Sequence, residues 1–197
     1  NHTEGFAFGS LSSFQKLDSS VFDVWANILR RSSSRSVLRL MRYALHDLAE
    51  PRLREELAAR GVHPSRLEFT PMAPWLDHVW RKTHLDVMLD SIVKSGHSVM
   101  QDGLWASVPS VSLAGNRMEA RAGVTALRAV RLSAYTEALS LRDYESLAAS
   151  LERHPSKLVA VRSLLKKRLT VAPLFDTKRW ASSFSHSLHA AYEAFSH

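Results

Sequence analysis

Residues 84–115 read HLDVMLDSIVKSGHSVMQDGLWASVPSVSLAG, and this stretch decides the fold that the sequence predicts. Its first seven residues, 84–90, form a mostly apolar run with a polar end, which is typical of a buried parallel strand. After a loop, residues 97–108 have helical spacing, and residues 109–115 form a second short strand between a proline and a glycine. The apolar positions of the helix that are available for packing are Val99, Leu104 and Trp105.

The loop between this strand and helix predicts an anion site. Gly96 opens the helix and allows a close approach of the backbone. The first N–H groups of a helix have no partner within it, and they lie at the positive end of the helix dipole. A negatively charged ligand is therefore expected beyond the end of the strand.

The rest of the chain repeats the alternation of short strands and longer helices. Further strands are predicted at residues 6–11, 37–43 and 67–70, and an apolar link at 135–139. Helices are predicted after a cap at Asp18, Ser19 or Ser20, and over 51–60, 75–82, 116–130, 141–153 and 157–169, with a last one capped by Asp176. The first helix has an apolar stripe of Val21, Trp25, Ile28 and Leu29. This order predicts an α/β fold with a parallel sheet.

Composition narrows the classes of protein. The chain has 197 residues, of which 45% are hydrophobic and 23% charged, so we expect one domain over 1–197, with 131–197 its mostly helical C-terminal part. No apolar run approaches the roughly 18 residues of a membrane span. The chain has no cysteine, which excludes disulfides and cysteine-based zinc sites and fits an intracellular compartment.

The net charge of +7 has two interpretations. It is either an ordinary solvated surface or an attraction to partners that carry phosphate. The hypothesis of a nucleic-acid-binding module depends on this charge alone, because the sequence shows no surface of basic and aromatic residues of the RNA-binding kind. His186 and His189 lie three residues apart without a further ligand, so no metal site is predicted.

Polar and basic candidates follow the predicted strand ends. In an open parallel sheet the loops at these ends share one edge, where ligands bind. Lys16 suits a phosphate, although a lysine beside Asp18 is also an ordinary surface residue. The other candidates are Ala73, Pro74, His78, Arg81, Gly96, His97, Ser98 and Asp102.

Each of these side chains also has a plainer interpretation. His97 is either a donor to a phosphate oxygen or a histidine at a helix start. Asp102 either accepts from ribose hydroxyls or is an exposed helix carboxylate. His78 and Arg81 share a helix face, and they either contact a base or belong to a polar surface.

Four stretches together resemble the C-terminal catalytic lobe of the O-linked N-acetylglucosamine transferase family, which includes the plant Spindly-type O-fucosyltransferases. They are FGSLSSFQKLDSSVFDVWANILRR at 8–31, EFTPMAPWLDHVWR at 68–81, the stretch at 85–115, and APLFDTKRW at 172–180. The resemblance covers residues 6–197. The pattern of Gly96, His97 and Asp102 is nearer to the N-acetylglucosamine branch.

The resemblance implies a GT-B fold, with two Rossmann-like lobes and the donor, UDP-N-acetylglucosamine, in the cleft between them. Lys16 would hold the diphosphate and stabilise the leaving group. The other implied roles are diphosphate binding by Gly96, His97 and Ser98, ribose binding by Asp102, and uracil binding by Ala73, His78 and Arg81. No metal or other cofactor is expected, and the implied partners are an N-terminal lobe, a helical-repeat region and protein acceptors.

The sequence also departs from the family pattern. Val99 replaces a hydroxyl residue, Trp75 replaces a lysine and Ser13 replaces a glutamine. The first lobe and the repeats do not occur in this sequence, so this chain alone is not expected to turn over. Two readings stay open: half of a glycosyltransferase, or an inactive relative with a structural or interaction role.

Overall fold

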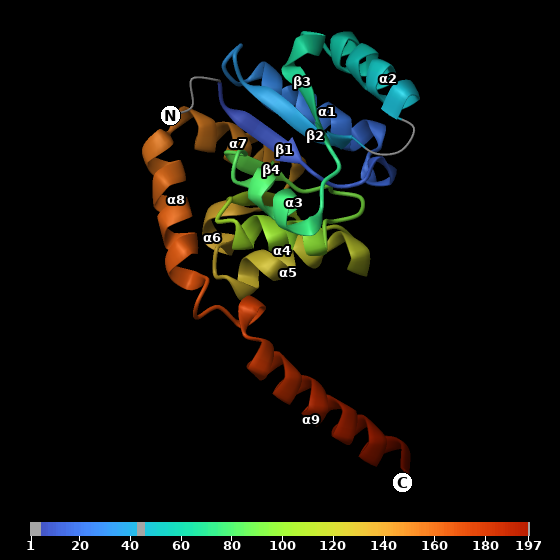
Figure 1. Cartoon of the computed structure of the whole chain (residues 1–197), viewed down its shortest axis with the longest axis vertical. Coiled ribbons are helices and arrows are strands. Elements are labelled where there is room, and N and C mark those ends of the chain that lie inside the picture. The colour runs from blue at the N-terminus through green and yellow to red at the C-terminus, as the bar shows by residue number, and fades with distance from the viewer. Residues whose placement is uncertain (1–4, 43–45, 197) are drawn as a thin grey trace.

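The computed structural model describes residues 5–42 and 46–196 and has a six-stranded parallel sheet at its centre (Figure 1). The strand order is β3-β2-β1-β4-β5-β6, and all five pairs of neighbours run parallel. The strands are β1 (Ala7–Ser10), β2 (Val37–Arg42), β3 (Leu67–Pro71), β4 (Val87–Leu89), β5 (Ser110–Leu113) and β6 (Glu137–Ala138). The predicted α/β fold with a parallel sheet is confirmed. The predicted second strand extended to Tyr43, which lies outside the described residues.

The connections between strands are mostly helical. The α-helices are α1 (Ser19–Arg30), α2 (His46–Ala59), α3 (Trp75–Lys82), α4 (Ser98–Trp105), α5 (Ala122–Ala129), α6 (Ser133–Thr136), α7 (Leu141–Arg153), α8 (Pro155–Arg168) and α9 (Thr177–Ser196). Short 3₁₀ turns occur at η1 (Phe14–Lys16), η2 (Pro64–Arg66), η3 (Met118–Ala120) and η4 (Pro173–Phe175).

The chain reverses its direction across the sheet between β3 and β4. It builds outward from β1 to β3, then returns to place β4 on the free side of β1. Phe8 and Gly9 of β1 pair with Val87 and Met88 of β4. A Cβ at Gly9 would lie 2.5 Å from the side chain of the buried Leu85, so any larger residue here would displace that leucine. The β1–β4 junction is a topological switch point, where ligands of open α/β sheets bind.

The helices cover both faces of the sheet. Right-handed crossovers place α1 and α2 on one face and, after the reversal, α3 and α4 on the other. The contacts agree, since α1 packs against α7 whereas α3 packs against α4. The predicted stripe of α1 is confirmed, because Val21, Trp25, Ile28 and Leu29 are all buried.

Several predicted boundaries are wrong. Helix α2 begins at His46 rather than at Pro51, so Pro51 lies inside the helix, where it costs a backbone hydrogen bond. The buried Leu57 further along packs into the core and stabilises the helix. The helix predicted over 116–130 is broken into η3 and α5, where the Arg121 guanidinium donates to two backbone carbonyls of the preceding turn. The link at 135–139 contains the two-residue strand β6. Trp105 is 53% exposed and packs on Phe175 rather than in the core.

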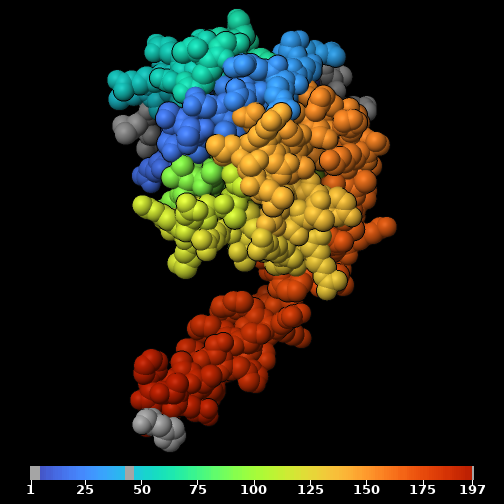
Figure 2. Space-filling view, turned by 180° about the vertical axis from the view of Figure 1, so that it is seen from behind, coloured from blue at the N-terminus to red at the C-terminus, as the bar shows by residue number. Residues whose placement is uncertain are grey.

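The C-terminal helix α9 extends away from the rest of the molecule (Figures 1 and 2). Asp176 caps it as predicted, because its Oδ1 accepts from the backbone N–H of Arg179 at 2.9 Å. All the described side chains of α9 are exposed, including those of Trp180 and Phe184, whose rings stack 5.1 Å apart. Among the described residues, no helix is long and apolar enough to cross a membrane.

Candidate nucleotide site

Lys16 bridges the two strands of the switch point. It is the last residue of η1, the first turn after β1, and its Nζ donates to the backbone carbonyl of Ser95, 3.0 Å away in the loop after β4. The Ser91 hydroxyl in turn donates to the Lys16 carbonyl at 2.5 Å. Burial lowers the pKa of Lys16, with Lys94 acting in the same direction and Asp90 in the opposite one. A partly buried cation is therefore fixed at the β1–β4 junction.

A buried carboxylate at the end of β4 organises the loop that Lys16 contacts. Asp90 is 3% exposed, and its Oδ1 accepts from the backbone N–H of Gly96 at 2.7 Å. Its Oδ2 accepts from the hydroxyls of Ser95 at 2.5 Å and Ser112 at 2.6 Å. Burial raises the pKa of Asp90, and these three donors and Lys16 partly oppose that rise. The role of Asp90 was missed from the sequence, where it appears only as the polar end of an apolar run.

More distant elements complete this network. The backbone N–H of Gly123, near the start of α5, donates to the Ser95 hydroxyl at 2.7 Å. The buried Tyr144 on α7 donates from its hydroxyl to the Asp90 carbonyl at 2.8 Å. A Cβ at Gly123 would lie 2.1 Å from Asp90 Oδ2, so the network and this glycine depend on each other. The loop between β4 and α4 is thus held from β5, α5 and α7.

Helix α4 begins where this loop ends. Ser98 is its first residue, and the exposed His97 occupies the N-cap position without a side-chain cap. The N–H groups of the first turn have no partner within a helix. The Gly96 N–H is engaged with Asp90, and a Cβ at Gly96 would lie 3.0 Å from Met100. Gly96, His97 and Ser98 therefore directly follow Ser95, the residue that Lys16 contacts, while their phosphate-binding roles stay predictions.

A second group of candidates lies on α3 and α4. The Asp102 carboxylate on α4 is 3.4 Å from the Nζ of Lys82 on α3. His78 lies close enough for both charges to act on its imidazole. Burial lowers the pKa of His78, Lys82 and Arg81 lower it further, and Asp102 raises it. Arg81 donates to the carbonyl of Pro71 at 2.6 Å, so part of its guanidinium is engaged by the end of β3.

The structure brings His78 and Asp102 near each other, and Lys82, which contacts Asp102, is not among the sequence candidates. Ala73 lies in the short segment between β3 and α3, immediately before Pro74, the N-cap residue of α3. All the candidates thus follow β1, β3 or β4 along the chain, in the loops and helices after these strands.

A pocket of about 510 Å³ adjoins the Lys16 loop. It lies beyond the ends of β1, β4 and β5, and it is lined by Gln15, Ile92, Val93, Lys94, Gly115, Asn116, Arg117, Glu119 and Ala120. Its Arg117 and Glu119 form a loose ion pair at 3.9 Å. A cavity lined by both polar and apolar groups, beside a partly buried lysine at a switch point, suits a phosphorylated, hydroxyl-rich ligand.

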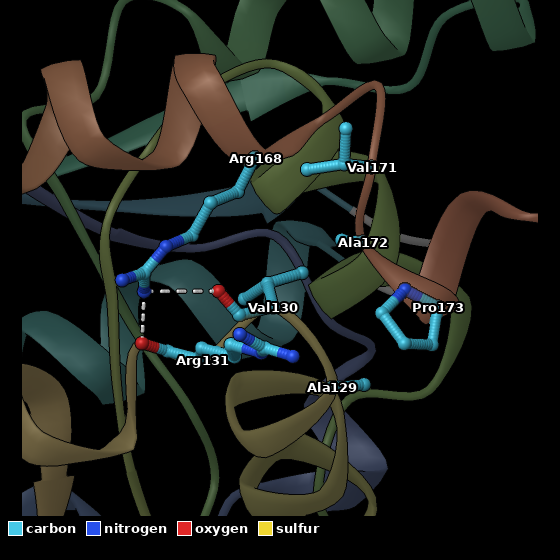
Figure 3. Close-up of a pocket in the computed structure, with 7 residues that line it drawn as sticks. All are labelled: Ala129, Val130, Arg131, Arg168, Val171, Ala172 and Pro173. Atoms are coloured by element: carbon cyan, nitrogen blue, oxygen red, sulfur yellow. Dashed lines mark hydrogen bonds between the residues drawn. The ribbon is translucent and has the colours of Figure 1, made fainter.

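Another pocket, of about 330 Å³, lies elsewhere, between the end of α5 and the segment after α8 (Figure 3). The guanidinium of Arg168 donates to the carbonyls of Val130 and Arg131 at its edge. These residues are not among the sequence candidates. In the described part of the chain, no group of three or more His, Asp or Glu side chains could hold a metal ion.

The family is decided by a match over nearly the whole chain. Residues 3–184 match the family described as Glycosyl transferase family 41. The chain belongs to this family. The resemblance to the O-linked N-acetylglucosamine transferases is thereby confirmed.

Curated proteins with similar sequences support this family assignment. It is 34% identical, over 182 residues, to the probable UDP-N-acetylglucosamine--peptide N-acetylglucosaminyltransferase SEC of Arabidopsis thaliana, and the match covers 92% of this chain and 18% of that protein. It is 28% identical over 187 residues to the rice protein named SPINDLY, with 94% and 20% covered. The chain therefore spans about a fifth of these relatives.

Solved structures agree on the fold. A mutant of the Thermobaculum terrenum O-GlcNAc transferase superposes with a TM-score of 0.85 and 30% identity, over 96% of this chain and 35% of that one. HepE of Anabaena, solved with UDP and glucose, superposes with a TM-score of 0.65 over 93% of this chain and 49% of that one. At 14% identity it supports the fold alone. The sheet is that of a lobe of a GT-B glycosyltransferase.

Proposed function

We propose that this chain is the donor-binding lobe of a protein O-glycosyltransferase and that it binds UDP-N-acetylglucosamine. The observation that carries the proposal is the position of Lys16, whose Nζ contacts Ser95 across the switch point, in the loop that leads into α4. A cation and a helix N-terminus thus converge on the place where nucleotides bind in open α/β sheets. The names of the relatives support the identity of the donor.

The proposed roles follow the geometry. Lys16, His97 and Ser98 hold the diphosphate, with Gly96 giving it close access to the backbone. Asp102 accepts from the ribose hydroxyls, because a carboxylate is a strong acceptor for neighbouring hydroxyl donors. The segment at Ala73 and the side chains of His78 and Arg81 contact the uracil. No metal enters this proposal, since Lys16 supplies positive charge at the diphosphate.

The reaction that we propose is inverting transfer of the sugar to a Ser or Thr hydroxyl. The hydroxyl oxygen bonds to the anomeric carbon, the bond from that carbon to the diphosphate breaks, and the hydroxyl proton is released. Negative charge grows on the departing UDP, and a preorganised cation such as Lys16 stabilises it. An N-terminal lobe, a helical-repeat region and protein acceptors, which this sequence does not include, are part of the proposal. The proposal also includes an intracellular location of the protein.

Calorimetric titration of UDP into the chain tests the proposal. We expect binding in the micromolar range that is lost or strongly weakened in Lys16→Ala and His97→Ala. Lys178→Ala and His186→Ala, at exposed positions on α9, are the matched controls and should bind as the unaltered chain does. Absence of heat from a folded protein would contradict the proposal and favour an inactive relative with a structural role.

A further inference from the structure

Lys82 is unusual among the lysines of the described chain, because it is fully buried. It is the last residue of α3, and its side chain has an exposed fraction of 0%. Its Nζ lies 3.4 Å from Asp102 Oδ2, which is the partner that the structure shows for it. Asp102 lies on the neighbouring helix α4 and is 18% exposed. One buried charge therefore ties two helices together at the candidate nucleotide site.

The physical chemistry of this pair is asymmetric. An ammonium group without water is costly unless an opposite charge compensates it, so Lys82 depends on Asp102. Burial lowers the pKa of Lys82, and Asp102 opposes that change. The C-terminal end of α3 also favours a cation. Asp102, being partly exposed, keeps access to a ligand while one of its oxygens is held from within.

We propose that Lys82 is a positioning residue that orients the Asp102 carboxylate and thereby sets the preference of the site for ribose over deoxyribose. A carboxylate held by one oxygen presents its other oxygen in a fixed direction, so it can accept from a ribose hydroxyl without first losing side-chain freedom. Without Lys82 the Asp102 side chain would be free to turn into solvent. This inference rests on the proposed function, because it takes Asp102 as the ribose contact.

The test compares UDP with 2′-deoxy-UDP and 3′-deoxy-UDP by calorimetry. For the unaltered chain we expect UDP to bind about tenfold or more tightly than the deoxy compound that lacks the contacted hydroxyl, as for a hydrogen bond to a charged acceptor. In Lys82→Met, which fills the same space without charge, this ratio should fall to within about twofold, with little change in the affinity for the deoxy compound. Lys178→Met on α9 should keep the full ratio.

Two further variants make the test specific. In an Asp102→Asn background, Lys82→Met should change the ratio no further, because Lys82 acts through Asp102. Lys82→Gln keeps a polar group in the buried site and should give a reduced ratio even if Lys82→Met does not fold.

The inference would be overturned if a folded Lys82→Met or Lys82→Gln variant still preferred UDP over the deoxy compound as strongly as the unaltered chain does. That result would leave the proposed function intact. Failure of the unaltered chain to bind UDP at all would instead overturn the proposed function, and this inference with it.

Discussion

Replacing Lys16 by methionine removes the cation at the switch point while keeping a side chain of similar length. Lys16 Nζ is partly buried and held 3.0 Å from the Ser95 carbonyl, so little of its side-chain freedom remains to be lost when a phosphate binds. A hydrogen bond to a charged group contributes about 1.5–3 kcal/mol. Lys16→Met should therefore weaken UDP binding by about 10- to 150-fold at neutral pH.

The same residue predicts a pH dependence. Burial lowers the pKa of Lys16, so the unliganded site loses its cation at a lower pH than an ordinary lysine would. Because the protonated form binds the diphosphate, UDP affinity should be highest below this pKa and should fall as the pH rises through it. Lys16→Arg keeps its charge at alkaline pH and should bind UDP without this loss.

Calorimetric titrations of UDP over a series of alkaline pH values provide the assay, with Lys178→Met as the control. The unaltered chain and the control should lose affinity together, whereas Lys16→Met should be weak throughout and nearly independent of pH in this range. Affinity for UDP in Lys16→Met equal to that of the unaltered chain at neutral pH would refute the reasoning, because Lys16 would then not face the diphosphate.

Other predictions concern the support of the site. Tyr144→Phe leaves the buried Asp90 carbonyl without its donor and should lower the free energy of unfolding by about 1–3 kcal/mol in urea titrations; no change would show that this bond carries no stability. Because burial raises the pKa of Asp90, its contribution to stability is present at acid pH and is lost as the pH rises through that pKa. The stability of the unaltered chain relative to Asp90→Asn should therefore decrease with rising pH, and a constant difference would contradict this. Asp18→Ala removes the cap of α1, whose Val21 N–H donates to the carboxylate at 2.8 Å, and should cost about 1 kcal/mol in the same assay, unlike the exposed control Ser34→Ala.

Much of the fold could be predicted from local signals. Helices α3 and α7 begin and end where the sequence predicts, because Pro74 precedes one and Ser140 caps the other. The parallel sheet follows from the alternation of strands and helices, whereas the order of its strands was not predicted. Strand β6 could not be found, since two residues carry no alternating pattern, and the early start of α2 depends on packing that Pro51 conceals.

The candidate site likewise has some features that local sequence predicts and others that depend on distant contacts. The positions of Lys16 and of the start of α4 could be predicted, because a strand followed by a polar loop is a local feature, while the binding roles of these residues stay predictions. The role of Asp90 could not, because its partners Ser112 and Tyr144 are 22 and 54 residues away. Lys82 and Asp102 likewise lie on different helices, and they are 20 residues apart in the sequence. These contacts form only when the sheet brings the elements together.

The central claim is that a nucleoside diphosphate binds at the junction of β1 and β4. Titration of UDP into isotopically labelled protein, followed by the chemical shifts of the backbone amides, tests this most directly. The account predicts that the chemical shifts of the backbone amides of Lys16 and of residues 96–98 change with UDP concentration and give the same dissociation constant. Shifts confined to the pocket of residues 129–131 and 168–173, or no shift in a folded chain, would contradict it.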